Sequence, residues 1–336
     1  MDNQEKSPIP AVLFLVFNRP DTTKLVLEAI GQARPPRLYV ACDGPRLERQ
    51  GEGESVQQVR ALIQELVVWP CEVHTLYRDK NLGCKRAVAS ALDWFFEHEE
   101  AGIVLEDDCL PHPDFWHFCR ELLDRYALDE RIFMISGNNF QDGRQVTQDS
   151  YYASALTHIW GWASWRRSWN KVDLDLPGYE QWVKMGGLER LFGSGRLVRA
   201  WLRTFARYQE GRYNTWDYPF LFAAWKHDQY ALLPAVNLVT NIGFGHRGAT
   251  HTAQDRFHGL SNLPTASLGF PLRHPDPLQH QRQADVRTLR NKMFPTYTLK
   301  AWRLFRAMLV HYLTFMGGLL GKKPVGKLFG LPSARL

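Results

Sequence analysis

The sequence predicts an α/β fold in which a mixed, mostly parallel sheet is flanked by helices. Over the first 150 of its 336 residues, short apolar runs alternate with helix-like segments, and the connections are short. This alternation is typical of parallel strands joined by crossover helices. Hydrophobic residues make up 45% of the chain, which is enough for a sizeable core and excludes general disorder.

Each expected element has a local reason. The strands are short apolar runs bounded by turn residues, and Asp43-Gly44-Pro45 ends the second of them. The first helix begins in the turn 18–21 and runs to about residue 33, and proline marks the start of another helix near Pro113. We expect strands at 11–17, 37–42, 72–77, 102–105 and 132–136, with further helices at 55–67, 84–98 and 113–126.

The second half of the chain has a different composition. Eight of its twelve tryptophans lie between Trp160 and Trp225, and helical patterns recur at 193–210 and 215–228. The spacing of the tryptophans around Trp165 and Trp169 is typical of a helix that faces the core. We therefore expect Trp165 and Trp169 to lie in such a helix. Residues 252–295 show little periodicity, so we expect a loop or lid there.

Cysteine usage and charge exclude several classes of protein. The five cysteines are odd in number and show no CxxC spacing, so neither a disulfide framework nor a zinc site is indicated. The net charge of +6 is concentrated in the segment from Lys300 to Leu336, where seven basic residues occur without an acid. The rest of the chain is about neutral, which argues against nucleic acid as a partner.

The two ends of the chain suggest where the protein works. Residues 1–10 are polar and the apolar run at 11–17 is too short for a signal peptide, so we expect a cytoplasmic protein. Residues 296–321 mix large apolar with basic residues and are followed by Lys322-Lys323, as in an interfacial amphipathic helix. This tail predicts a peripheral location on the inner face of the cytoplasmic membrane; packing on the domain and an oligomer contact are the alternatives.

The run Gly102 to Asp108 is the most informative segment. Three buried-strand residues, Ile103 to Leu105, lead directly into Glu106, Asp107 and Asp108. Adjacent carboxylates resist burial unless a cation is present, and ligands of α/β sheets bind at the carboxyl ends of strands. The run therefore predicts a site for Mg²⁺ or Mn²⁺, with a solvated acidic turn before Pro111 as the alternative.

An ordered set of motifs over residues 10–255 resembles the GT-A nucleotide-sugar glycosyltransferases. The resemblance is to family 2, to bacterial family-2-like or hemolysin-like sugar transferases, and more closely to the β-1,2-N-acetylglucosaminyltransferase I family. The motifs are Phe17-Asn18-Arg19-Pro20, Cys42-Asp43-Gly44, Asn81-Leu82-Gly83, Leu105-Glu106-Asp107-Asp108, Trp160-Gly161-Trp162, Trp216-Asp217 and the Gly-rich segment ending Ala249-Thr250-His251.

The resemblance implies roles for the donor-side residues. Asp108 would bind the metal that bridges the diphosphate, Asp107 would hydrogen-bond the ribose, and Glu106 would support them. Asp43 would pair with the base, against the alternative of an ordinary turn aspartate. Arg19 would contact nucleotide or phosphate, against surface solvation.

Lys85 belongs to the loop that enters the helix at 84–98. Backbone N–H groups of this loop could face the nucleotide, and a solvent lysine is the equal alternative for Lys85.

Asp217 is the candidate general base. A sugar hydroxyl is a very weak acid, so an inverting transfer needs a positioned carboxylate. An acid in a similar Trp-Asp context has this role in the resembling family, although Tyr218 here replaces a second acid. A helix N-terminal acid is the structural alternative, and Asp228 is the second candidate.

The remaining candidates lie around the acceptor and the diphosphate. Thr250 would contact phosphate and His251 would lie near the metal, with His246 and Arg247 as alternatives. Trp160, Trp162 and Trp216 would line the acceptor cleft, since flat apolar rings stack on sugars.

These observations lead to one hypothesis with two alternatives. We expect a Mn²⁺- or Mg²⁺-dependent glycosyltransferase that moves a sugar from a nucleotide-diphosphate donor, UDP-linked by the resemblance, to a glycan or lipid-linked glycan. A nucleotidyltransferase and a non-catalytic membrane-associated protein are the alternatives. The expected organisation is a nucleotide-sugar half (1–150), an acceptor half (151–255), a lid (256–295) and the basic tail (296–336).

Overall fold

The computed structural model describes residues 8–193, 195–245 and 259–295 of the chain. Its strands are β1 (Val12–Val16), β2 (Arg37–Cys42), β3 (Glu72–Tyr77), β4 (Ala101–Glu106), β5 (Cys109–Pro111), β6 (Ile132–Ser136), β7 (Tyr151–Ser154), β8 (Trp162–Trp165), β9 (Tyr230–Pro234) and β10 (Val239–Asn241). Its helices are α1 (Pro20–Ala33), α2 (Glu52–Leu66), α3 (Gly83–His98), α4 (Asp114–Arg125), α5 (Arg166–Trp169), α6 (Tyr179–Lys184), α7 (Gly187–Phe192), α8 (Arg196–Gln209), α9 (Asp217–Lys226), α10 (Arg282–Thr288) and a π-helical turn (Leu289–Met293).

One eight-stranded sheet organises the molecule, and it is mixed and mostly parallel, as the sequence predicts. The strand order is β3-β2-β1-β4-β8-β6-β9-β7. Strands β1 to β4 pair in parallel, whereas β8 runs antiparallel to both β4 and β6, and β7 runs antiparallel to β9. A small second sheet pairs β10 with β5 just beyond the end of β4.

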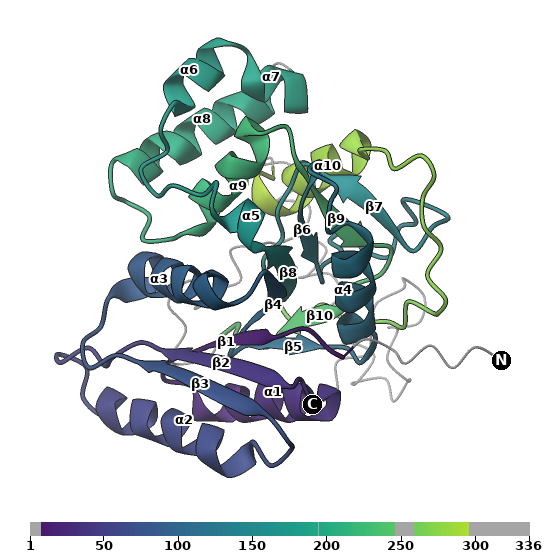
Figure 1. Cartoon of the computed structure of the whole chain (residues 1–336). Helices are drawn as coiled ribbons and strands as arrows, with labels where there is room; N and C mark the ends of the chain where they lie inside the picture. The colour runs from purple at the N-terminus through teal and green to yellow at the C-terminus, as the bar shows by residue number, and fades with distance from the viewer. Residues whose placement is uncertain (1–7, 194, 246–258, 296–336) are drawn as a thin grey trace, which may run out of the picture.

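Successive side chains of the central strands serve two separate cores. On β1, Val12, Phe14 and Val16 pack with α1, α2 and α4, while Leu13 and Leu15 pack with α3. Figure 1 shows α1 and α2 on one face of the parallel half and α3 on the other. Because both faces are covered, these strands are apolar throughout and do not alternate.

The second half of the chain adds a helical layer made of α6, α7, α8 and α9. These helices enclose a third, aromatic core, whose central rings are Trp201, Phe205 and Trp225. In Figure 1 the layer lies above α3, at the top left. Strands β7, β8 and β9 nevertheless join the main sheet, so residues after 150 share its cores with residues before 150.

The prediction of a helix around Trp165 is wrong. Residues Trp162–Trp165 form β8, a central strand buried on both faces, and only the short α5 follows it. Trp162 packs in the core beside α3 and Trp165 in the core beside α4. The tryptophan spacing suits a helix as well as a strand, and the tertiary pairing with β4 and β6 decides between them.

Other elements are longer or additional. Helix α2 begins three residues before the expected 55, at Glu52, whose carboxylate accepts hydrogen bonds from Arg46 and Asn18. In the described part of the expected lid, 259–295, most residues are irregular, but α10 and the π-helical turn form at its end. Among the described residues, no helix is both long and apolar enough to cross a membrane. The basic tail lies outside them.

We predict that Gly102→Ala lowers the free energy of unfolding by about 1–3 kcal/mol, the usual cost of overpacking. A Cβ at Gly102 would lie 2.3 Å from Phe95 Cζ and 2.8 Å from the Ala11 carbonyl oxygen. Chemical denaturation measures the change. Gly53→Ala is the matched control, because a Cβ there meets nothing within 4 Å and α2 should gain about 0.5–1 kcal/mol. Equal effects of the two substitutions would contradict this account of the β1–β4 packing.

Candidate active site

The predicted carboxylate site is formed at the carboxyl ends of β1 and β4. These strands pair in register, with Leu15 opposite Glu106, so the chain that leaves β1 passes beside Asp107 and Asp108. The Arg19 guanidinium donates to Asp108 Oδ2 at 2.7 Å and also bonds Asp107 Oδ1. Asp107 is only 2% exposed and Asp108 only 5%. A largely buried arginine, whose side chain is 13% exposed, therefore joins the two aspartates.

Backbone and amide groups complete this arrangement. The Phe17 N–H donates to Asp107 Oδ2 at 3.3 Å, and Asn241 Nδ2 donates to Asp108 Oδ1 at 3.2 Å. A Cβ on Gly243 would lie 2.2 Å from Asp108 Oδ2, so only glycine lets the backbone pass this close. Asn241 and Gly243 were not among the sequence candidates; they come next to Asp108 only through the pairing of β10 with β5.

Arg19 adds a positive charge that the sequence argument did not place at the acids. Adjacent acids need a positive charge nearby, and in the structure the Arg19 guanidinium forms ion pairs with both Asp107 and Asp108. Burial lowers the pKa of Arg19, and the attraction of the two aspartates outweighs this, so its pKa is raised overall. Burial raises the pKa of Asp107, and the charge of Arg19 opposes that rise. Arg19 was expected at the nucleotide; its position against the carboxylates is the new observation.

Glu106 is the third acid, and its electrostatics differ from those of its neighbours. Burial and the charges of Asp108 and Asp107 raise the pKa of Glu106 to about 8. At neutral pH the carboxyl is then mostly protonated, which limits the negative charge gathered at this edge.

Asp217 faces the same edge from the helical layer. It is the first residue of α9, and the Thr215 hydroxyl donates to its Oδ1 at 2.5 Å. Its charge contributes to the raised pKa of Glu106, so the two carboxylates are close enough to interact. The second candidate, Asp228, is exposed just beyond the other end of α9. The structure thus brings Asp217, and not Asp228, to the carboxylate site.

Cys84 is a residue that the sequence gave no reason to select. Burial and the charges of Glu106, Asp217 and Asp43 raise the pKa of its thiol to about 12. Cys84 therefore lies among these acids at the start of α3, as a neutral thiol at physiological pH.

Asp43 and Lys85 have structural partners in this arrangement. The Asp43 carboxylate accepts hydrogen bonds from the N–H groups of Gly44, Leu82 and Gly83, at 2.9–3.1 Å. It thereby caps the start of α3, and the loop N–H groups expected to face a nucleotide are already bonded. Lys85 Nζ lies over the Tyr208 ring at 4.4 Å and bonds the Leu174 carbonyl, which links α3 to the helical layer.

Two of the three expected acceptor tryptophans are core residues. Trp162 is 1% and Trp216 is 2% exposed, and their rings stack on one another at 5.7 Å. Their faces are covered by protein, which corrects the expectation that they stack on a sugar. Trp160 is partly exposed and contacts Phe244 edge to face, so it remains a candidate.

Thr250 and His251, with their alternatives His246 and Arg247, lie outside the described residues. Within the described ranges, no group of three His, Cys, Asp or Glu side chains is arranged to hold a metal ion. A hard cation that arrives with phosphates needs only one or two carboxylates, and Asp108 with Asp107 supplies oxygen donors of that kind. The donor set therefore fits a divalent cation that is shared with a diphosphate.

Comparisons with known proteins leave the family open. No protein-family model and no curated protein matches the chain. Similar solved structures include S. aureus TarS 1–349 (TM-score 0.33, 11% identity, 46% of this chain and 46% of that chain) and HddC from Yersinia pseudotuberculosis (0.29, 10%, 47% and 77%). A third is GalNAc-T7 with UDP, GalNAc and Mn²⁺ (0.40, 11%, 69% and 43%). The chain spans less than half of the TarS and GalNAc-T7 chains, and similarity at this level carries no argument about function.

We predict that Glu106→Gln changes how stability depends on pH. An acid whose folded-state pKa is raised to about 8 makes the free energy of unfolding fall as pH rises from about 4.5 to 8. The isosteric amide removes this fall, so the variant should match the wild type near pH 4 and exceed it at pH 8 by about 3–4 kcal/mol.

Urea denaturation between pH 4 and 8.5, in a buffer with EDTA, measures this difference. Glu65→Gln is the control, because Glu65 is exposed on α2 and its replacement should leave the pH profile unchanged. A constant offset of Glu106→Gln at all pH values would show that the carboxyl does not titrate in this range.

Proposed function

We propose that this chain is a GT-A-type glycosyltransferase that moves a sugar from a nucleotide diphosphate to a hydroxyl group of a glycan, with inversion. The observation that carries the proposal is the pairing of Arg19 with Asp107 and Asp108 at an edge where Asp217 lies close enough to Glu106 for their charges to interact. A transferase needs a charged site for the diphosphate and a separate base for the acceptor. The sheet edge offers the first and the start of α9 offers the second.

The donor side would work by charge. A nucleoside diphosphate carries negative charge to an edge that already holds carboxylates, so positive charge must accompany it. Arg19 is one such charge. A divalent cation held by Asp108 would neutralise the charge that develops on the leaving diphosphate. The order of Asp43, Asp107, Asp108 and Asp217 along the chain, which resembles that of the GT-A enzymes, supports UDP as the nucleotide.

The acceptor side would work by proton transfer. Asp217 accepts the proton of the attacking hydroxyl, and the Thr215 hydroxyl holds the carboxylate in place. The oxygen attacks the anomeric carbon from the side opposite the diphosphate, forms the new glycosidic bond and breaks the bond to phosphate. One direct displacement of this kind inverts the anomeric carbon.

The donor prediction is tested by calorimetric titration of the purified protein with UDP, GDP and CDP, first with Mn²⁺ and then with EDTA. We expect UDP to bind with the metal and to lose at least tenfold in affinity without it, because the metal shares the charge of the diphosphate. Asp108→Asn should show weak binding under both conditions. Absence of binding by every nucleotide with metal would refute the proposal.

The base prediction compares the carboxylate at the start of α9 with one just beyond its end. Asp217→Asn should lower kcat by about 10²–10⁴-fold in sugar transfer from UDP-sugars to a pool of oligosaccharides, and should leave UDP affinity unchanged. Asp228→Asn is the matched control: Asp228 is exposed, and asparagine tolerates its left-handed backbone (φ 52°). Full activity of Asp217→Asn, or equal loss in both variants, would remove Asp217 as the base.

A further inference from the structure

The outward face of α8 carries a row of arginines. Every charged residue of this helix is an arginine, and all of them are exposed: Arg196, Arg199, Arg203 and Arg207, here called the arginine row. Spacings of three and four residues align them along one side of the helix over about 17 Å. The other side of α8, with Trp201 and Phe205, is buried in the aromatic core. The arginine row therefore points away from the helical layer.

This row is unfavourable for the helix itself. Arg199, Arg203 and Arg207 follow one another at intervals of four residues, and like charges at that spacing destabilise a helix. Arg196 is the first residue of α8, where the helix dipole disfavours positive charge. Within the described ranges no carboxylate forms an ion pair with the row, and Glu210, which follows the helix, is paired with Arg212. Local interactions do not account for the row, whereas an anionic partner would.

The guanidinium groups keep most of their hydrogen-bonding capacity. Arg196 bonds the Phe294 carbonyl, and Arg207 Nη1 donates to the Tyr213 hydroxyl at 3.4 Å. Each of these bonds uses one of the five donors of a guanidinium and leaves its charge unbalanced. Guanidinium groups are weakly hydrated and donate paired hydrogen bonds to phosphate oxygens. The chemistry of the row thus suits a partner that presents several phosphates.

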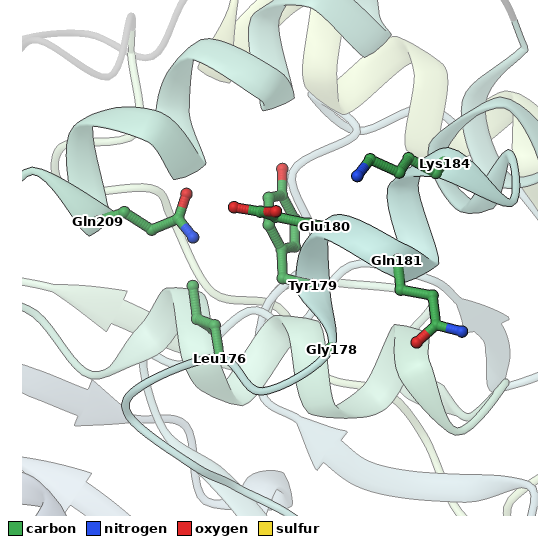
Figure 2. Close-up of a pocket in the computed structure, with 7 residues that line it drawn as sticks. All are labelled: Leu176, Gly178, Tyr179, Glu180, Gln181, Lys184 and Gln209. Atoms are coloured by element: carbon green, nitrogen blue, oxygen red, sulfur yellow. The ribbon is translucent and has the colours of Figure 1, made fainter.

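The arginine row lies on a convex surface and not in a groove. Figure 2 shows a hollow of about 440 Å³ beside α6 and the end of α8. Its lining includes Gln209 of α8 but none of the four arginines. Single-stranded nucleic acids are held in basic grooves that offer aromatic rings for stacking, and the exposed side of α8 has neither. It offers instead Leu202, which is 37% exposed between Arg199 and Arg203. A straight basic helix with an exposed leucine fits a flat, anionic and partly apolar surface.

The described chain ends beside this row. The Phe294 ring meets Trp201 edge to face at 5.1 Å, and the Phe294 carbonyl is the one that Arg196 bonds. Pro295 is the last described residue, and the sequence from Lys300 onward has seven basic residues and no acid. The basic tail therefore starts at one end of the arginine row. Because its charge is of the same sign, the tail is not a suitable occupant of the row. An anionic surface would attract both.

We propose that α8 is a membrane-contact surface whose arginine row binds the anionic headgroups of a phospholipid bilayer, with the basic tail as a second contact. Each arginine near an anionic bilayer strengthens the attraction, and two modest contacts on one chain together give stable association. This inference does not depend on the proposed sugar transfer.

The test measures how the full chain sediments with vesicles of phosphatidylcholine, alone or mixed with phosphatidylglycerol at about three to one. We expect binding to the anionic vesicles that weakens as salt is added, because salt screens exposed charges. Arg199→Gln/Arg203→Gln should weaken this binding by about ten- to thirtyfold. In urea denaturation this variant should be at least as stable as the wild type, because it removes like charges one turn apart.

Lys24→Gln/Arg49→Gln is the matched control. It removes the same charge from exposed residues of α1 and of the turn before α2, which lie away from the helical layer (Figure 1). Charges farther from the bilayer than a Debye length are screened, so this variant should weaken binding by about twofold at most. The surface is overturned if anionic vesicles do not bind, if neutral vesicles bind equally well, or if Arg199→Gln/Arg203→Gln binds no more weakly than the control variant.

Two further probes identify other partners. If Arg199→Gln/Arg203→Gln loses affinity for polyuridylate or polyglutamate and keeps its affinity for vesicles, the row binds nucleic acid or an acidic protein, and the membrane contact is overturned. UDP titration of the same samples is independent. Absence of nucleotide binding with retained vesicle binding would refute the transferase and leave the membrane contact standing.

Discussion

The ion pairs of Arg19 with Asp107 and Asp108 are the constraint on which the rest of the site depends. They hold the end of β1 against the end of β4, and Asn241 and Gly243 reach the same carboxylates because β10 pairs with β5. Two carboxylates this deeply buried are stable only with a matching positive charge. The ion pairs therefore link the folding of the central sheet to the formation of its charged edge.

The helical layer has the complementary task of bringing a separate carboxylate to that edge. Its core of interlocking aromatic rings fixes α9, and the stacked pair Trp162–Trp216 anchors the start of this helix to the sheet. Large rigid rings lose little freedom on packing, which makes them suited to holding one side chain in position.

The comparison of sequence and structure is most instructive at particular residues. The carboxylates after β4 were recognisable because an apolar strand that ends in three acids has few structural explanations. Asp43 was selected by resemblance as the residue that pairs with the base, but its hydrogen bonds from Leu82 and Gly83 come from a loop far along the chain. The strand that ends at Trp165 was misread as a helix because a strand buried on both faces lacks the alternation that distinguishes strands from helices. The partner of the acids, Arg19, was selected for another role.

The sequence by itself determined the parallel half of the sheet, its helices and the edge at which acids collect, since these follow from local periodicity and turn residues. Only the tertiary structure decided which positively charged and negatively charged side chains lie next to one another. Arg19 and Asp108 are 89 residues apart, and Asp217 is farther still from Glu106 along the chain. Local patterns carry no information on such pairs, because strand order and helix packing set the distances through space on which electrostatic and hydrogen-bond energies depend.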